Sequence, residues 1–395
     1  MEFAEFILAH DADDLSRLAL ARARYAAEVA DFDLALTTLE VRRKLRTKVP
    51  QWYANPSLRF PLRLSGEQCS SAETARYKAK VAADACGGGA LADLTGGLGV
   101  DAWAFAQVFD RVLYNEMKPE LAAAATANFA ALGVGNIVVR NSTVGETSVS
   151  QILGDFTPDI LFLDPARRAT DGRKVFRLED CQPDVLQLLP ELLAASPKVL
   201  LKLSPMADIT LVCRQLGCVK TVHVVAAEGE CKELLLLLER GYEGPYTTVV
   251  YENGSVLALD QVRGETVFAE SVEGMLFEPG KALLKSGAFD VPCAFGLKKL
   301  ARHTHLYIGE EVPEALRPFG KQFRILETAP LDKRSMKDIG KRYPKASVTA
   351  RNIPMTSDEL RRRLGVADGG SVHVFGIHVA DNILIVCQLA QQTGA

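Results

Sequence analysis

Glycines and acidic residues at the ends of expected strands are the first candidates for chemistry in this chain. An expected strand over residues 91–94 runs into Gly97-Leu-Gly-Val-Asp-Ala102, which fits the nucleotide-binding pattern G-x-G-x-x-G/A. Glycines at such a turn let the backbone approach a ligand closely, and the following helix offers free N–H groups. Glu116 ends the next expected strand, where its carboxylate can accept hydrogen bonds from both hydroxyls of an adenosine ribose.

The cofactor class depends on Asp93, which lies three residues ahead of the first glycine of this turn. Nicotinamide dinucleotides and S-adenosylmethionine both bind at turns of this kind. A carboxylate at Asp93 can receive the ammonium group of S-adenosylmethionine, whereas it would repel a pyrophosphate at close range. The sequence therefore favours S-adenosylmethionine.

The order Asp93-Leu-Thr-Gly-Gly-Leu-Gly99, Glu116 and Asp164-Pro-Ala-Arg167 resembles the class I S-adenosylmethionine-dependent methyltransferases. In particular it is similar to bacterial RNA methyltransferases that carry a C-terminal THUMP-like domain and are related to trimethylguanosine synthase. The segments RRKLRTKVPQW, EQCSSAETARYK and ECKELLLLL also resemble that group. The resemblance covers most of residues 40–240 and, more loosely, the C-terminal segment. It implies an S-adenosylmethionine cofactor and an RNA partner.

The resemblance also implies which residues contact the cofactor. These are Asp93, Thr95, Gly96, Gly97, Gly99, Glu116 and Met117. Ser142 and its neighbour Asn141 follow the third expected strand, where many members keep an acid or amide near the adenine, so we expect a polar contact there. Asp101 is a further cofactor-binding candidate, with capping of the following helix as the alternative.

Asp164-Pro165 is the expected catalytic centre, together with Arg167. In class I methyltransferases that act on amino groups, the fourth strand ends in Asn, Asp or Ser followed by Pro-Pro and an aromatic residue. Asp164 and the Pro165 carbonyl could accept hydrogen bonds from an exocyclic amine and hold its nitrogen for attack on the methyl group. Ala166 and Arg167 depart from that pattern, although a guanidinium can stack on a base or bind phosphate. The alternative is that Asp164-Pro165 only ends a strand and caps a turn.

A basic cluster follows this motif and contains Arg168, Arg173, Lys174 and Arg177. We interpret it as a landing surface for a nucleic-acid backbone. The alternative is a surface network of ion pairs with Asp171, Glu179 and Asp180, which would stabilise the protein little.

The elements that must position these residues alternate along the chain. Expected strands are 91–94, 111–115, 136–140, 159–163, 198–203, 221–226 and 234–239, and expected helices are 102–109, 119–132, 183–195 and 209–217. This alternation predicts an α/β fold with a Rossmann-like, mostly parallel seven-stranded sheet, in which the seventh strand could return antiparallel. Residues 15–45 keep apolar residues at helical spacing without Gly or Pro, and residues 71–85 form another expected helix.

We expect four parts: a helical N-terminal segment (1–85), the methyltransferase domain (86–240), a small α+β domain (241–319) and a basic THUMP-like domain (320–395). The third part contains a hairpin signal, YENGSVLAL. The last part begins with a strand, QFRILE, continues with basic helical stretches and ends in two strands, SVHVFGIHV and NILIVCQLA.

Composition narrows the class of protein. The 395 residues carry a net charge of −3, yet residues 320–365 hold twelve Lys and Arg against five Asp and Glu, which is +7 and leaves −10 elsewhere. A basic module suggests a polyanionic partner, with a solvated helix face as the alternative.

The N-terminus lacks the basic-then-apolar order of a signal peptide, and no apolar run could cross a bilayer, so a cytoplasmic protein without membrane contact is expected. The eight cysteines lack zinc-site spacing, so we expect reduced, mostly buried thiols and no metal.

The expected function is methylation of RNA (rRNA or tRNA) at a base nitrogen. One rival is a methyltransferase for a small molecule or a protein. Another is a non-catalytic RNA-binding protein that kept the fold, at which Ala166 and Arg167 could hint.

Overall fold

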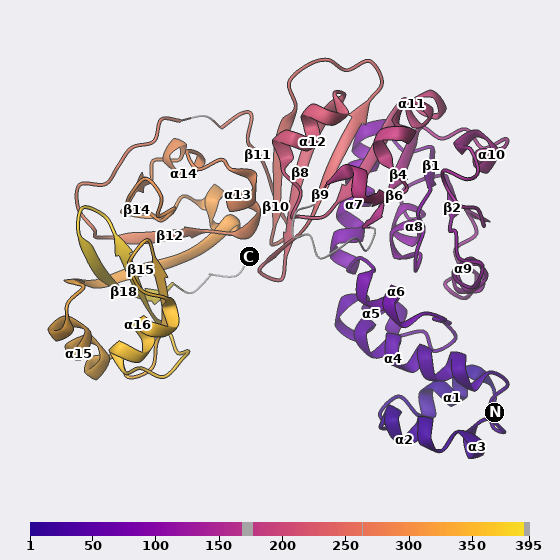
Figure 1. The fold of residues 1–395 in the computed structure, drawn as a ribbon, viewed down its shortest axis with the longest axis horizontal. Helices are drawn as coiled ribbons and strands as arrows, with labels where there is room; N and C mark the ends of the chain where they lie inside the picture. Colours follow the sequence, from indigo (N-terminus) through magenta and orange to yellow (C-terminus); the bar gives the residue numbers. More distant parts are fainter. Residues whose placement is uncertain (168–176, 263, 391–395) are drawn as a thin grey trace. The chain divides into compact units, whose positions relative to one another are not determined.

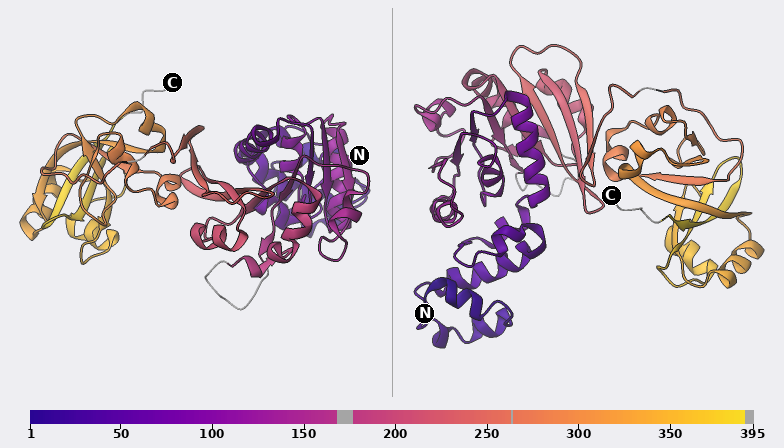
Figure 2. Two further views of the ribbon diagram at one scale, coloured as in Figure 1. Left: turned by 90° about the horizontal axis from the view of Figure 1, so that it is seen from above. Right: turned by 180° about the vertical axis from the view of Figure 1, so that it is seen from behind.

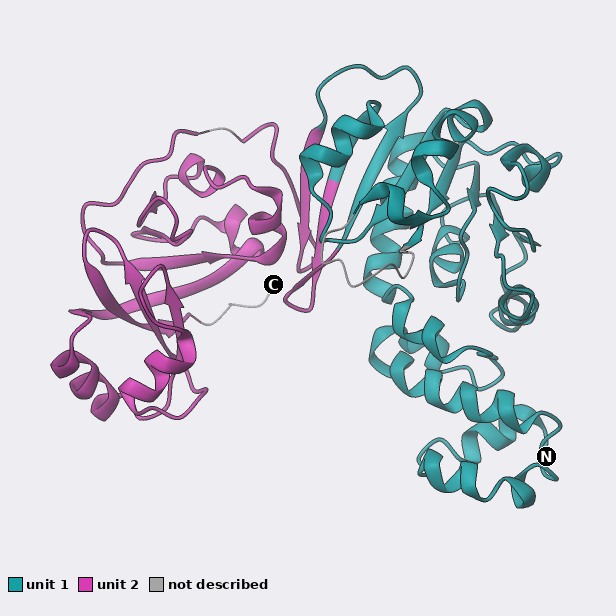
Figure 3. Ribbon diagram, in the orientation of Figure 1, with its two compact units in different colours: residues 1–222, 233–246 teal, residues 223–232, 247–395 magenta. Residues whose placement is uncertain are grey.

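The computed structural model describes residues 1–167, 177–262 and 264–390. The chain forms two compact units: residues 1–222 with 233–246, and residues 223–232 with 247–395 (Figure 3). The finer division into four domains stays a prediction.

Short helices make up the N-terminal part of the first unit. They are α1 (Phe3–Ala9), α2 (Leu15–Leu20), α3 (Arg22–Tyr25), α4 (Phe32–Lys48), α5 (Pro50–Tyr53) and α6 (Arg63–Gln68). The helical prediction for residues 15–45 was wrong over residues 26–31. Asp31 accepts a hydrogen bond from Leu34 N and so starts a new helix, α4, where apolar spacing alone suggested continuity. Phe6, Ile7 and Leu39 are buried in the core of this part.

The larger sheet has nine strands within the described residues, two more than predicted (Figure 1). All seven predicted strands are present, and the hairpin strands β10 (Thr247–Glu252) and β11 (Ser255–Ala258) extend the sheet beyond β8. The seven predicted strands are β1 (Ala90–Asp93), β2 (Arg111–Asn115), β3 (Ile137–Arg140), β4 (Ile160–Leu163), β7 (Lys198–Leu203), β8 (Val219–Ala227) and β9 (Glu230–Glu239). Their spatial order is β3-β2-β1-β4-β7-β9-β8. Strands β3, β2, β1, β4 and β7 are parallel, and β9 pairs with β7 in the antiparallel direction, as the sequence suggested. The α/β prediction is confirmed.

Helices cover both faces of this sheet. They are α7 (Ala72–Cys86), α8 (Val100–Phe105), α9 (Pro119–Ala131), α10 (Val149–Leu153), α11 (Val185–Ala195) and α12 (Ile209–Leu216). The views in Figures 1 and 2 place α7 on one face and α11 and α12 on the other. All residues of β1 and β4 are buried, which is why these strands appear in the sequence as short continuous apolar runs.

The second unit contains a seven-stranded sheet in the order β13-β14-β12-β15-β18-β17-β16. Its strands are β12 (Met275–Pro279), β13 (Lys298–Lys299), β14 (Tyr307–Gly309), β15 (Gly320–Pro330), β16 (Ser347–Arg351), β17 (Val372–His378) and β18 (Asn382–Leu389). The predicted hairpin is also present, as β10 (Thr247–Glu252) and β11 (Ser255–Ala258). Asn253 and Gly254 both have positive φ at its two-residue turn.

Two helices, α15 (Lys333–Arg342) and α16 (Ser357–Leu364), pack with this sheet. Their apolar residues, including Ile339 and Leu360, form a core with Val374 and Val386 of β17 and β18. The basic segment between the strands was expected to be helical, but residues 347–351 form the parallel edge strand β16. Shorter elements complete the unit: α13 (Lys281–Ser286), α14 (Val291–Ala294) and a 3₁₀ turn over Glu314–Phe319.

Five of the eight cysteines are buried, which agrees with the prediction that most of them would be. Within the described residues, no helix is both long and apolar enough to cross a membrane.

Candidate active site

A cavity of about 450 Å³ lies in the first unit, where the carboxyl ends of the parallel strands meet. This is the edge at which parallel α/β sheets bind ligands, close to the switch in strand order between β1 and β4. Of the predicted site residues, the following line it: Thr95, Gly96, Gly97, Gly99, Asp101, Glu116, Met117, Ser142 and Asp164. Asp93 and Pro165 are buried and do not line the cavity.

The glycine turn after β1 requires its glycines. A Cβ atom at Gly96 would lie 2.1 Å from the Tyr114 ring, so no side chain fits there. Gly99 has φ +93° at the residue before α8, and a Cβ there would lie 2.9 Å from Phe129. The turn therefore brings bare backbone to the cavity wall.

Glu116 is held in place by two backbone N–H groups. Gly97 N donates to Oε2 at 2.9 Å, and Lys118 N donates to Oε1, also at 2.9 Å. Each carboxylate oxygen can accept a second hydrogen bond, so Glu116 retains capacity for a ligand. Asn141 Nδ2 donates to the Glu116 carbonyl at 2.6 Å, which ties the residue after β3 to the same wall.

Asp93, at the end of β1, is almost completely buried and only partly satisfied. Its Oδ1 accepts a hydrogen bond from Thr95 N at 3.0 Å, while its Oδ2 has no hydrogen-bond partner. Burial raises the pKa of Asp93 well above its ordinary value, the Thr95 N–H partly opposes this, and the charges of Asp101, Asp164 and Glu116 add to it. A buried carboxylate with one orphan oxygen favours a cationic partner.

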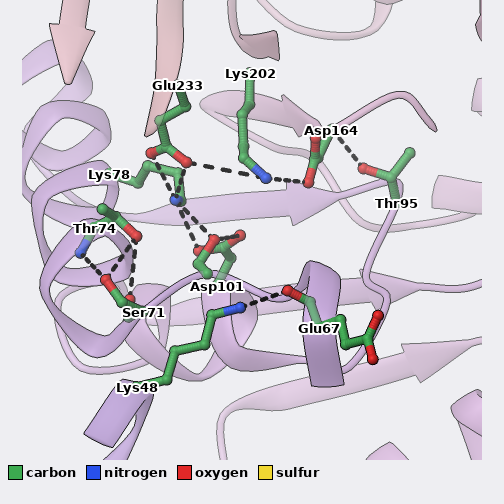
Figure 4. Close-up of polar contacts among 11 residues, drawn as sticks. Lys48, Glu67, Ser71, Thr74, Lys78, Thr95, Asp101, Asp164, Lys202 and Glu233 are labelled. Atoms are coloured by element: carbon green, nitrogen blue, oxygen red, sulfur yellow. Dashed lines mark hydrogen bonds and ion pairs between the residues drawn. The ribbon is translucent and has the colours of Figure 1, made fainter. Parts of the chain in front are cut away.

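Asp164 directly follows β4 and is held from two sides. Its backbone N donates to Thr95 Oγ1 at 2.6 Å, and its Oδ2 accepts a hydrogen bond from the ammonium group of Lys202 on β7 (Figure 4). Ala166 and Arg167 form a short strand, β5, that pairs with β6 (Cys181–Gln182). The motif therefore does more than end a strand, because its carboxylate lines the cavity and pairs with a lysine.

Lys202 lines the cavity and was missed by the sequence reasoning. Burial alone would lower its pKa, but the charges of Asp164, Glu233 and Asp101 raise the pKa further than burial lowers it. Lys202 is therefore an ammonium ion at neutral pH. The sequence did offer a signal for Lys202: it is a lysine within the strand sequence KVLLKL, whose buried positions are all apolar.

Another lysine, the buried Lys78 of α7, connects this pair to Asp101, which follows the glycine turn (Figure 4). Its Nζ lies 2.8 Å and 3.1 Å from the two carboxylate oxygens of Glu233 and 3.3 Å from Asp101 Oδ1. Ser70 Oγ accepts from Lys78 Nζ at 2.9 Å and donates to Asp101 Oδ2 at 2.8 Å. Asp101 was predicted either to contact the cofactor or to cap the following helix. Its place in an ion-pair network was not predicted. Lys202 lies 3.9 Å from Glu233 and completes the chain of charges.

The predicted basic cluster falls largely outside the described residues. The side chain of Arg167 and all of Arg168, Arg173 and Lys174 belong to the part that the structure leaves undescribed. Arg177 is exposed, and Glu179 accepts a hydrogen bond from Gln215 Nε2 at 2.8 Å. The arginine landing surface and its alternative both stay predictions. Within the described residues, no group of three or more His, Cys, Asp or Glu side chains could hold a metal ion.

Comparison with known proteins assigns the chain to a family. It aligns with the crystal structure of a protein described as a methyltransferase from Porphyromonas gingivalis W83, with a TM-score of 0.83, 30% sequence identity and 98% of both chains covered. An uncharacterized S-adenosylmethionine-dependent methyltransferase of Mycobacterium tuberculosis, found in the strains CDC 1551 / Oshkosh and ATCC 25618 / H37Rv, is 26% identical over 305 residues, or 75% of this chain and 78% of that one.

Two family models match the second unit. A ferredoxin-like domain model matches residues 275–316, and a THUMP domain-like model matches residues 320–389. The methyltransferase relatives identify the enzyme class and its cofactor, and the family models add the C-terminal domains. The chain belongs to the class I S-adenosylmethionine-dependent methyltransferases that carry a C-terminal THUMP-like domain.

Proposed function

We propose that this enzyme methylates a base nitrogen in RNA (rRNA or tRNA), with Asp164 holding the acceptor amine. One observation carries the proposal: a single cavity of about 450 Å³ is lined by the glycine turn, by Glu116 and by Asp164. A cofactor bound along the glycine turn would then share this cavity with a residue suited to orient an amine.

The residues proposed to hold the cofactor fit its chemistry. S-adenosylmethionine carries an ammonium group. Its proposed acceptor is the orphan Oδ2 of Asp93, which does not line the cavity and would have to become accessible from it when the cofactor binds. Its ribose has two hydroxyl donors, which suit the remaining acceptor capacity of Glu116. The other proposed contacts are Thr95, Gly96, Gly97, Gly99, Asp101, Met117 and Ser142. When bound, the cofactor supplies a methyl group on a sulfonium.

Asp164 and Pro165 are proposed to position the acceptor. An exocyclic base amine is a weak nucleophile because its lone pair is delocalised into the ring. A carboxylate and a backbone carbonyl that accept its two N–H bonds favour the geometry in which the nitrogen lone pair is available. The ammonium of Lys202 donates a hydrogen bond to Asp164 Oδ2 and so fixes the orientation of the carboxylate. Arg167 remains proposed to stack on the base or to bind phosphate.

RNA is the proposed substrate class because of the second unit. Its THUMP-like region overlaps residues 320–365, which carry a formal charge of +7. Such a surface favours a polyanion, and exocyclic amines of bases are the acceptors that the cavity suits. The proposed four-part division assigns this task to residues 320–395 and the chemistry to residues 86–240.

The decisive experiment compares nucleosides of total RNA from cells with and without the gene by mass spectrometry. We expect one N-methylated nucleoside to disappear and to return when the purified enzyme and S-adenosylmethionine are added to the unmethylated RNA. Methyl transfer to a protein or metabolite fraction instead of RNA would favour the rival substrate class. Absence of any S-adenosylmethionine binding in calorimetry would contradict the active site itself.

A further inference from the structure

A second cavity, of about 340 Å³, lies in the THUMP-like region between α15 and α16. In Figure 1 these two helices lie side by side at the C-terminal end of the colour scale. Four of its seven lining residues are cationic: Lys333, Lys337, Lys341 and Arg363. All four side chains are exposed to solvent.

The three lysines share one face of α15. They follow each other at i, i+4 and i+8, so each lies about one helical turn, or about 6 Å, beyond the last. Like charges at this spacing destabilise a helix. Within the described residues, no ion pair or side-chain hydrogen bond offsets the charge of any of these lysines. The acid of this helix, Asp338, lies instead 4.0 Å from Arg334.

The cations elsewhere in this basic region are arranged differently. Arg342 pairs with Glu327 at 2.8 Å, Arg351 pairs with Glu278, and Arg361 pairs with Asp358 at 2.8 Å. Among the described residues of this region, four exposed cations besides the lysine face also lack an acidic partner: Lys321, Arg324, Lys345 and Arg362. The unpaired lysines of α15 therefore stand out from a region in which most arginines are already neutralised.

Close packing of the helix backbones joins Arg363 to the lysine face. A Cβ atom at Gly340 would lie 1.8 Å from the carbonyl oxygen of Leu364, so α15 and α16 meet at backbone distance. Gly365, with φ +70°, ends α16 at this point. Arg363 donates one bond to Glu359, at 2.6 Å, and its guanidinium has further N–H donors.

We propose that Lys333, Lys337, Lys341 and Arg363 form a binding site for the phosphodiester backbone of RNA. The inference rests on the proposed RNA substrate and assigns the contact to particular residues. Ammonium groups repeated along a helix contact successive phosphates as point charges, while the guanidinium can bind one phosphate through two N–H donors. Because these groups would face phosphates and not base edges, binding is independent of sequence and falls steeply with salt.

The test measures binding of the full-length protein to a fluorescent, mixed-sequence single-stranded RNA between about 50 and 200 mM KCl. The triple variant Lys333→Gln, Lys337→Gln, Lys341→Gln removes three charges while keeping a similar helix propensity. We expect the slope of log affinity against log salt to become shallower by about 2 relative to the wild-type protein. The matched control, Lys321→Gln, Arg324→Gln, Lys345→Gln, removes the same charge elsewhere and should keep most of the wild-type slope.

Two results would overturn the inference in distinguishable ways. If the wild-type protein binds RNA and the two triple variants show equal slopes, the lysine face is not the site, although an RNA substrate still stands. If the wild-type protein shows no salt-dependent binding to RNA, the proposed substrate class fails as well. Lys→Arg replacement at the same three positions should preserve the slope, and unchanged thermal midpoints should exclude misfolding of the variants.

Discussion

Lys202 on β7 forms an ion pair with Asp164, the residue that directly follows the neighbouring strand β4. The lysine side chain is 14% exposed and the aspartate side chain 36% exposed, so the pair sits at the cavity wall, partly shielded from water. It links the proposed acceptor of the substrate amine to Glu233 and Lys78 behind it. The orientation of Asp164 therefore depends on charges from three other elements: β7, β9 and α7.

Replacing Lys202 by Met should lower kcat by roughly a hundredfold, because Asp164 and Glu233 lose their shared cation and Asp164 is no longer held in one orientation. S-adenosylmethionine affinity should change little. Lys202→Arg keeps a cation and should restore part of the rate. Single-turnover methyl transfer and calorimetry separate the two effects, and an unchanged kcat in the Met variant would show that the pair is only structural.

Asp164→Ala should lower the rate of methyl transfer by about a thousandfold or more, because both the carboxylate acceptor and the partner of Lys202 are lost. Asp164→Asn keeps an oxygen acceptor and should retain more activity than the Ala variant. Both should bind S-adenosylmethionine nearly as well as the wild-type protein does. Equal loss of binding and of activity in the two variants would assign Asp164 a structural role instead.

Asp93→Asn should stabilise the cofactor-free protein by about 1 kcal/mol at pH values where the carboxyl group is ionised, because a buried charge is replaced by a neutral amide. The same change should weaken S-adenosylmethionine binding at least about tenfold, since a charged partner for the ammonium is lost. Thermal denaturation and calorimetry measure the two effects. A variant that is destabilised and still binds normally would contradict this role.

Cofactor binding should depend on pH through Asp93. Its pKa is raised in the folded protein, so between the ordinary and the raised value the folded state holds a proton that the unfolded chain has released. The contribution of Asp93 to stability therefore falls as pH rises through this window. An ammonium ligand prefers the ionised carboxylate, so binding should release a proton and tighten with rising pH.

Calorimetry in two buffers with different ionisation enthalpies counts the released protons. Asp93→Asn should lose this proton release while other pH effects persist. A wild-type protein whose binding enthalpy is the same in both buffers would contradict the proposed ionisation.

Lys78→Met should destabilise the first unit by about 3–5 kcal/mol, because buried Glu233 loses its nearer cation and Asp101 loses its cationic partner. The exposed pair of Lys80 and Asp84 on the same helix provides the control: Lys80→Met should change stability by less than about 1 kcal/mol. Thermal midpoints of the two variants give the comparison, and similar midpoints would mean that the buried network contributes no more than a surface ion pair.

Much of the first unit could be predicted because its strands are buried on both faces. The expected strands 111–115 and 198–203 coincide with β2 and β7, since a short apolar run between turn residues is typical of a covered parallel strand. Strand β16 was missed because every one of its residues is only half-buried and it lies at a sheet edge, so its sequence shows no apolar run.

The residues of the candidate site were likewise predicted only in part. Asp93, Glu116 and Asp164 were identifiable because each follows a strand, and the ends of parallel strands meet at one edge. The partnership of Lys78 with Glu233 joins residues 155 positions apart, and neither spacing nor composition reports such a contact. Both residues lie in segments that resembled the methyltransferase group, EQCSSAETARYK and ECKELLLLL, which was the signal available.

The orphan oxygen of Asp93 has a consequence for turnover. In the proposed arrangement this oxygen binds the ammonium group at the amino-acid end of the cofactor. That end is identical in S-adenosylhomocysteine, the by-product of methyl transfer. Asp93 therefore cannot favour the fresh donor over the spent one. The enzyme should accordingly suffer product inhibition and depend in the cell on rapid removal of S-adenosylhomocysteine.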